Sequence, residues 1–310
     1  MARRPGIRWR RIGTVLLATW FITLSAIRLE SVLQDPFVDI RLYLRASSAW
    51  LTGGDPWSVR VADAIYSAAP PSLVVFAPFT IVPELVAVGI LLVLGLAASL
   101  WTLRRLGLPL WWITWPPLVD NLANGNPQIF LVPLLLGAVP WLAPLVKIYA
   151  VVPLVIQLRL RSLVCTGAVL LLSVPLLPWS DFLARSGATA ATLSELSRGG
   201  MSAWVLPAVL IPIGVVALIA LGRRRAAWWF LPVLWPATQW YYALMAMPAL
   251  TPLSAAILAV PIQGLPVLAA SVLAIETAFR HRYGWSWEGG RAPQTPGSPP
   301  ASTIVPCRRG

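Results

Sequence analysis

The chain has 310 residues, of which 58% are hydrophobic and only 11% charged, and its formal net charge is +13. So few polar residues cannot cover the surface of a soluble fold of this length, which excludes an ordinary soluble domain. Apolar stretches close to the about 20 residues of one spanning helix recur between residues 12 and 279. They are continuous rather than alternating, which disfavours transmembrane strands. We therefore predict an all-α fold, a polytopic transmembrane helical bundle of about eight or nine spans.

The positive charge is gathered in short groups between the apolar segments. These groups lie at residues 3–11, 104–105, 159–161, 223–225 and 280–282. Cytoplasmic loops of membrane proteins carry such an excess of arginine and lysine. The charge therefore predicts topology, with both termini in the cytoplasm, and we expect a multi-pass protein of the plasma membrane. A nucleic-acid partner would need a basic patch on a solvated domain, and the sequence suggests none.

Taken in chain order, the sequence begins with a basic stretch and an apolar run at 12–27, which we interpret as a retained first helix rather than a cleaved signal peptide. A polar segment, 28–71, follows on the outer side, and a long apolar run returns to the arginines at 104–105. The stretch 106–158 contains three short apolar pieces between two basic groups, so one piece is expected to be re-entrant or interfacial and to border a cavity. The remaining predicted segments are 162–178, an outer loop at 179–200, 203–221, 226–249 and 252–278. We expect one transmembrane domain, 1–284, and a disordered cytoplasmic tail, 285–310.

The first outer loop contains the most informative segment, residues 39–57. Asp39 is placed to cap a helix, and Gly53-Gly54 is placed to end it. Between them a polar stripe opposes an apolar face, which predicts an amphipathic helix on the outer membrane surface. The stripe consists of Arg41, Arg45, Ser48 and Thr52, and the apolar face of Ile40, Tyr43, Leu44 and Leu51.

Two interpretations of this segment stay open from the residues alone. In the first, Asp39 only caps the helix and the arginines meet lipid phosphates. In the second, a carboxylate beside cationic groups at the rim of a membrane cavity deprotonates a hydroxyl while a phosphate departs.

Lys147 begins an apolar run and is expected toward the outer end of its segment, where a charge at membrane level is costly. It either snorkels or pairs with Asp120, or it binds a phosphate. Polar side chains in apolar sequence are expected to face inward, for hydrogen bonding between helices or for sugar and phosphate contacts. These residues are Asn124, Asn126 and Gln128, with Tyr241 and Tyr242 forming a later aromatic break for which packing is the default interpretation.

Taken together, these residues resemble the GT-C membrane glycosyltransferases and, within them, glycosyltransferase family 87, the polyprenyl-phosphate-mannose-dependent α-1,2-mannosyltransferases. The first outer loop is similar to the family's Asp…Tyr…Gly-Gly-Asp-Pro-aromatic pattern. Residues 125–128 resemble its Gly-Gln-x-Asn element with the amide residues exchanged, and Lys147 with Pro153 resembles its Lys-x-x-Pro segment. Trp240-Tyr241-Tyr242 resembles a Trp-x-His-Tyr stretch, with Tyr241 where the family usually has histidine. The first-loop residues are Asp39, Tyr43, Gly53, Gly54, Asp55, Pro56 and Trp57.

The resemblance implies inverting transfer of a sugar, mannose in the family, from a polyprenyl-phosphate donor to a lipid or glycan acceptor of the cell envelope. Asp39 would be the general base, and Lys147 with Arg41 or Arg45 would bind the donor phosphate. Substrate contacts would come from Tyr43, Asp55, Asn126, Gln128, Tyr241 and Tyr242. Neither a cofactor nor a metal site is expected, since no Asp-x-Asp pair lies in an outer loop and arginine and lysine can neutralise phosphate. Membrane lipids are the other expected partners.

Two alternatives remain. A transporter or lipid flippase would also explain broken helices and a lysine at membrane depth, but it predicts two similar halves, which the sequence does not show. The second alternative is a non-catalytic relative of these enzymes that lacks late helices of the family.

Overall fold

The computed structural model describes residues 6–197 and 200–283, and nearly all of this part of the chain is helical. The predicted all-α class is confirmed. The strands in the described part are two residues each, β1 (Arg60–Val61) and β2 (Ala64–Ile65), paired antiparallel with Arg60 opposite Ile65. The predicted disordered tail, 285–310, lies outside the described residues.

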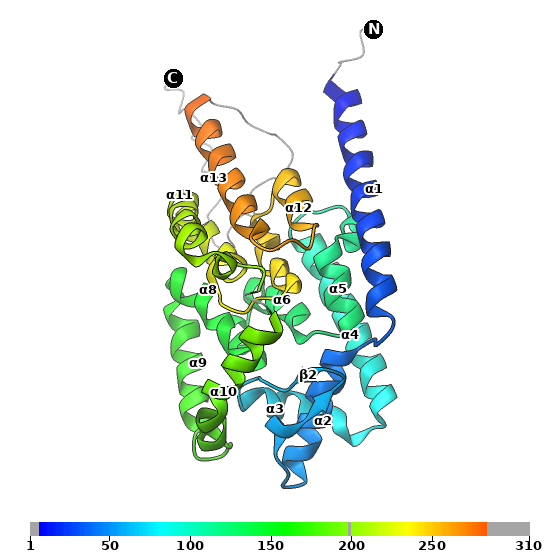
Figure 1. The fold of residues 1–310 in the computed structure, drawn as a ribbon, viewed down its shortest axis with the longest axis vertical. Helices are drawn as coiled ribbons and strands as arrows, with labels where there is room; N and C mark the ends of the chain where they lie inside the picture. The colour runs from blue at the N-terminus through cyan, green and yellow to red at the C-terminus, as the bar shows by residue number, and fades with distance from the viewer. Residues whose placement is uncertain (1–5, 198–199, 284–310) are drawn as a thin grey trace, which may run out of the picture.

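The longest straight helix, α1 (Gly6–Val32), runs along one side of the molecule, and its start lies at the same end as the finish of α13 (Leu265–Tyr283) (Figure 1). It packs on short helices from the middle and from the late part of the chain: the Ser25 hydroxyl donates to the carbonyl of Thr114 at 2.7 Å, and the Trp20 indole N–H to that of Ala256 at 3.2 Å. The second half of α1 therefore lies beside segments that are distant from it in the sequence.

The predicted amphipathic helix is α2 (Val38–Leu51), and Gly53, with φ 78°, directly follows its C-cap, Thr52. Its polar stripe is exposed or half-buried, while Ile40, Tyr43 and Leu44 are buried. Two details of the prediction are wrong. Phe37, not Asp39, occupies the N-cap position, so the Asp39 carboxylate is free for a distant partner, and Leu51 is 55% exposed. The loop continues through η1 (Pro56–Ser58), the two strands, α3 (Pro71–Phe76) and η2 (Ala77–Ile81).

Helix α4 (Glu84–Arg105) is predominantly apolar between its charged ends and is about 33 Å long at 1.5 Å per residue, which matches the hydrocarbon core of a bilayer. Its first residue pairs with α2: Glu84 accepts hydrogen bonds from Arg41 at 2.8 Å and from Arg45 at 2.9 Å. Its last two residues are exposed arginines, Arg104 and Arg105. Helix α2 and these arginines therefore lie at opposite ends of α4.

Between α4 and α9 the chain forms only short helices, because proline removes a backbone donor and clashes with the preceding turn. Prolines begin or interrupt most of these pieces, which agrees with the broken region predicted for 106–158. The elements are η3 (Leu110–Thr114), α5 (Pro116–Asn124), η4 (Pro127–Phe130), α6 (Leu131–Leu136), η5 (Pro140–Leu142), α7 (Ala143–Val146), η6 (Ile148–Ala150) and α8 (Val151–Ile156).

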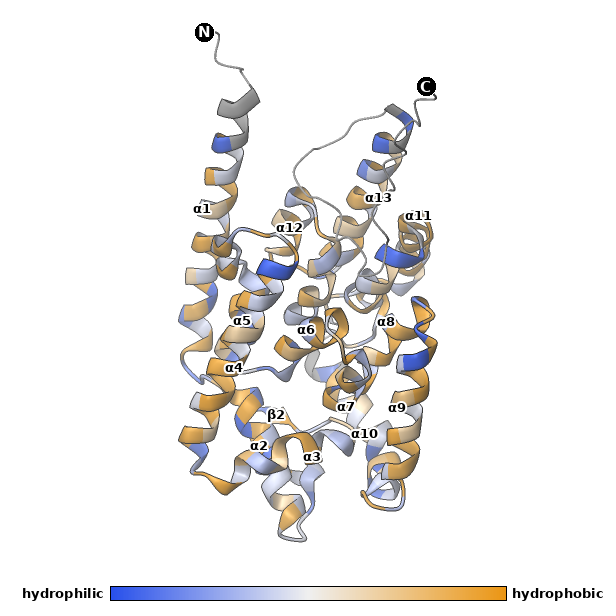
Figure 2. Ribbon diagram, turned by 180° about the vertical axis from the view of Figure 1, so that it is seen from behind, coloured by the Kyte–Doolittle hydropathy of each residue, from blue (hydrophilic) through white to orange (hydrophobic). Residues whose placement is uncertain are grey.

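Helix α9 (Leu160–Ser173) and helix α10 (Trp179–Ser197) follow, then η7 (Ala203–Val205). Figure 2 shows that most of α9 consists of hydrophobic residues. Helix α10 contacts the first outer loop: the rings of Phe182 and Trp57 have centroids 5.8 Å apart, and Arg185 forms an ion pair with Asp55. The expected outer loop at 179–200 is thus largely helical.

The helix labelled α11 (Pro207–Leu234) folds back on itself at Gly222, where φ is 71° and ψ 158°. A Cβ built on Gly214 would lie 2.8 Å from Val233, so the arms 207–221 and 223–234 run side by side. The sequence predicts two separate segments on either side of the arginines 223–225, and the two arms agree with this prediction. The chain ends in η8 (Trp240–Ala249), α12 (Pro252–Leu258) and α13.

Three of the described helices are long and apolar enough to cross a membrane, which supports association with a membrane. They are Arg11–Val32 of α1, α4 and α11, the last being the helix that turns at Gly222. Shorter apolar helices occupy Pro71–Ile81, Pro127–Leu136 and Leu160–Ser173. The expected count of eight or nine spans stays a prediction.

Candidate functional site

A buried polar network joins α2 to the turn after α5. The Asn126 side-chain amide donates to the Asp39 carboxylate at 2.6 Å, and the Asn126 oxygen accepts from the backbone N–H of Gln128 at 2.9 Å. Asn126 and Gln128 are 1% and 0% exposed, whereas Asp39 is partly exposed. A carboxylate held in one orientation with one side open can accept a proton from a molecule that arrives there.

The turn that presents Asn126 depends on a glycine. Helix α5 ends at Asn124, and Gly125 follows with φ 64°, a left-handed conformation that glycine adopts without a Cβ penalty. A Cβ at this position would lie 2.8 Å from the Ile40 side chain. Helix α2 therefore approaches the turn closely enough for Asp39, the neighbour of Ile40, to reach Asn126.

Lys147 faces the same network from the break between α7 and η6 and is 9% exposed. Its Nζ lies over three tyrosine rings, with centroids 5.7 Å away for Tyr43, 5.8 Å for Tyr149 and 5.5 Å for Tyr241. Such cation–π contacts stabilise an ammonium that has lost water. Lys147 is the chain's only lysine among 24 basic residues.

Gln128 connects the network to the late part of the chain. Its amide N–H donates to the backbone carbonyl of Tyr241 at 3.0 Å, and its oxygen accepts from the Tyr149 hydroxyl at 2.7 Å. Asn121 also donates to the carbonyl of Tyr241, at 3.1 Å. Four segments far apart in sequence are therefore fixed around Asp39 and Lys147.

A pair of stacked tyrosines borders this cluster. The rings of Tyr241 and Tyr242 stack with centroids 5.2 Å apart, and Tyr149 lies 5.1 Å from Tyr242. Both Tyr241 and Tyr242 keep part of their surface exposed, as does Asp39. A bound ring could therefore contact aromatic faces at the position where the carboxylate is reachable.

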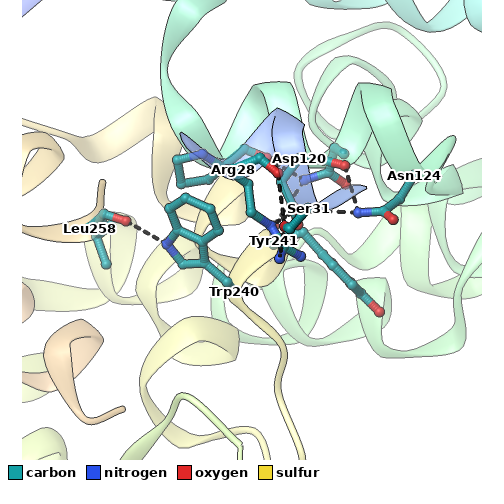
Figure 3. Close-up of polar contacts among 9 residues, drawn as sticks. Arg28, Ser31, Asp120, Asn124, Trp240, Tyr241 and Leu258 are labelled. Carbon is teal, nitrogen blue, oxygen red and sulfur yellow. Dashed lines mark hydrogen bonds and ion pairs between the residues drawn. The ribbon is translucent and has the colours of Figure 1, made fainter. Parts of the chain in front are cut away.

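A second charged cluster lies beside Tyr241, and sequence reasoning did not assign it to the site (Figure 3). Arg28, near the end of α1, donates to the buried carboxylate of Asp120 at 2.6 Å and lies 6.0 Å from the ring centroid of Trp240. Asn124 also donates to Asp120, at 3.2 Å. Asp120 is 1% exposed and the Arg28 side chain is 38% exposed, so the arginine of this ion pair lies partly exposed at the edge of the cluster.

The electrostatics of Asp39 suit a base. Burial raises the pKa of the Asp39 carboxyl above its ordinary value, because the low-dielectric surroundings disfavour the charged form. The positive charge of Lys147 and the hydrogen bond from Asn126 lower the pKa and offset part of that effect. A carboxylate with a raised pKa accepts a proton more readily than an exposed one.

The structure brings most of the predicted site residues together and separates three of them. Asp39, Lys147, Tyr43, Asn126, Gln128, Tyr241 and Tyr242 form the cluster. Arg41 and Arg45 instead engage Glu84. Asp55 caps η1 through the N–H of Trp57 and pairs with Arg185. The alternative pairing of Lys147 with Asp120 is wrong, because Asp120 forms its ion pair with Arg28.

No group of His, Cys, Asp and Glu side chains suited to a metal ion occurs within residues 6–197 and 200–283 as described. Comparison of the chain with protein-family models, with curated proteins and with solved structures gave no match. The functional assignment therefore depends on the site itself.

Sequence reasoning missed Arg28 and Tyr149. The basic groups that drew attention contain several arginines each, whereas Arg28 stands alone at the end of an apolar run. The position of Arg28 could have indicated a role in the site, because a single arginine at the outer end of a predicted first helix has no topological role there.

Proposed function

We propose that this chain is a membrane hexosyltransferase that moves a sugar, mannose by the family resemblance, from a polyprenyl phosphate to an envelope lipid or glycan. The observation that carries the proposal is the pairing of an oriented carboxylate, Asp39, with a buried ammonium, Lys147, at a partly open tyrosine-lined site. Proton acceptance and neutralisation of a leaving phosphate are the two tasks of such a transfer.

In the proposed reaction Asp39 takes the proton of an acceptor hydroxyl as its oxygen attacks the anomeric carbon. The new carbon–oxygen bond forms on the face opposite the phosphate, and the bond from the anomeric carbon to the phosphate oxygen breaks, so the configuration is inverted. The electron pair leaves with the polyprenyl phosphate, whose charge Lys147 neutralises. Tyr241 and Tyr242 would supply stacking surfaces for the sugars.

The cations around the site differ in how available they are. Lys147 contacts rings and has no anionic partner in direct contact within the described residues, so it can receive a phosphate. Arg28 lies at the neighbouring edge and is already paired with Asp120. Arg41 and Arg45 would first have to release Glu84, so we assign them a rim position, meeting the lipid phosphate on approach.

The orientation expected from the arginine groups would suit a lipid-linked donor on the outer side. Helix α4 separates α2 from Arg104 and Arg105 by the thickness of a bilayer, and arginine-rich ends favour the cytoplasm. Asp39 would then face the extracytoplasmic surface. A polyprenyl phosphate in that leaflet places its sugar at this level.

The proposal is tested with purified full-length protein in nanodiscs, given radiolabelled polyprenyl-phosphate mannose and membrane extract as acceptor. We expect label transfer by the native chain and a loss of at least about 100-fold for Asp39→Asn, the usual contribution of a general base. Asp63→Asn, an exposed carboxylate of the same loop, is the matched control and should retain activity. Equal transfer by Asp39→Asn and the native chain would remove Asp39 from the mechanism.

A transporter is the second candidate, and the breaks beside Asn126 and Lys147 favour it, since transporters bind substrates where helices are interrupted. The same nanodisc preparation distinguishes the two. Absence of label transfer, together with movement of the lipid-linked sugar across reconstituted vesicles, would establish the transporter. Absence of both would leave the non-catalytic relative.

A further inference from the structure

A separate, largely open cavity at the surface lies far along the chain from Asp39, between the turn of α11 and α13. Its volume is about 460 Å³, within the range of small-molecule sites. The walls come from the hairpin turn and from one residue of α13. The lining residues are Leu221, Gly222, Arg223, Arg224, Arg225 and Thr277.

Among the described residues the lining is strongly positive, with three arginines and no acidic residue. Arg225 is fixed, since its Nη1 donates to the Thr277 hydroxyl at 2.5 Å, and Thr277 itself donates to the carbonyl of Leu273 at 2.8 Å. Arg223 and Arg224 are exposed. The nearest acidic residue along α13, Glu276, lies 3.7 Å from Arg280, and its Oε2 atom accepts no hydrogen bond from the described residues.

The two helices that line this cavity also carry exposed apolar side chains. On the first arm of α11, Val216 and Ile219 are 66% and 74% exposed, and on α13 Ile275 and Phe279 are 56% and 58% exposed. A soluble anion would use only the arginines. An amphipathic molecule would use both parts, with its anionic group among the arginines and its chains along these side chains.

We propose that this cavity, the hairpin pocket, binds the phosphate headgroup of an anionic membrane lipid. Arginine recognises phosphate oxygens through two parallel hydrogen bonds, and Arg225 is held in place by Thr277 before the ligand arrives. Basic pockets between transmembrane helices on the cytoplasmic side suit such headgroups. The pocket is independent of the proposed glycosyl transfer, so either proposal can fail without the other.

The test uses the full-length chain in nanodiscs and in detergent. Native mass spectrometry counts the phosphatidylglycerol or cardiolipin molecules that remain bound after delipidation, and titration gives their affinity. We expect Arg223→Gln/Arg224→Gln to weaken binding roughly 25-fold, because each arginine near an anionic headgroup contributes about a factor of five. Phosphatidylcholine should not be retained by either protein.

A matched control separates a built pocket from general attraction to an anionic surface. Arg104→Gln/Arg105→Gln removes the same charge from an exposed pair outside the pocket lining and should leave lipid retention unchanged. Equal weakening by both variants would overturn the proposal. So would displacement of the lipid by millimolar inorganic phosphate, which would mean that the pocket recognises a free anion. Both glutamine changes are on exposed side chains, and monodisperse elution confirms folding.

Discussion

At the residue scale, the raised pKa of Asp39 predicts how activity depends on pH. A general base works only when deprotonated, so transfer should fall as the pH is lowered through the pKa of Asp39. Because burial raises that pKa, the acid limb of the pH–rate profile should lie at higher pH than for an exposed aspartate. The measurement is label transfer across pH at saturating donor.

Lys147 provides the check on that assignment. Its positive charge lowers the pKa of Asp39, so Lys147→Gln should move the acid limb of the residual activity to still higher pH. The position of the limb is compared, not the height of the profile, since loss of the ammonium also slows the reaction. A limb that stays in place in Lys147→Gln would show that another group titrates.

The sequence allowed the core of this site to be predicted because its residues are polar types in apolar surroundings. Asn126, Gln128 and Lys147 cost too much to face lipid, so an inward position follows from physical chemistry alone. The residues that these side chains contact cannot be deduced in the same way. Tyr149 contributes a ring and a hydroxyl at the same place, but a tyrosine in an apolar segment is equally suited to packing.

At the element scale, the turn between α5 and η4 determines whether Asp39 and Asn126 meet. Gly125→Ala places a methyl group about where Ile40 already lies and also strains the left-handed backbone. We expect a loss of about 2–4 kcal/mol of stability and loss of transfer activity, as α2 is displaced from the turn. Thermal unfolding in detergent and label transfer are measured together.

Gly107→Ala is the control for that change. Gly107 follows α4 with φ 67°, but a Cβ there meets no atom within 4 Å, so the substitution adds backbone strain without a clash. It should cost about 1–2 kcal/mol and leave transfer activity in place. Similar effects of the two substitutions would mean that the contact between Gly125 and Ile40 does not position Asp39.

The elements themselves were predictable to differing degrees. Glycine and proline signals located the end of α2 and the broken region before α9, and the arginines at 223–225 separated the two arms of α11. The N-cap of α2 was not predictable, because Phe37 takes a left-handed conformation, with φ 63°, that its residue type disfavours. Its N–H donates to the carbonyl of Ala123 at 3.0 Å, so the tertiary contact decides the boundary.

At the scale of the whole molecule, charge and helix length together define an orientation. The start of α1 and the end of α13 lie together at one end (Figure 1), and α4 connects the level of α2 with Arg104 and Arg105. If the arginine-rich ends face the cytoplasm, then Asp39, Arg28 and the first loop face outward. The candidate site and the hairpin pocket would then belong to opposite leaflets.

Cysteine labelling in intact cells tests this orientation. In a chain carrying Cys165→Ala and Cys307→Ser, Asp63→Cys should react with a membrane-impermeant maleimide added outside, because Asp63 is exposed in the first loop. Arg105→Cys, exposed at the far end of α4, should react only after permeabilisation. Each variant is the control for the other. Labelling of Arg105→Cys from outside, with Asp63→Cys protected, would invert the topology. A lipid-linked donor on the outer leaflet could not then reach Asp39.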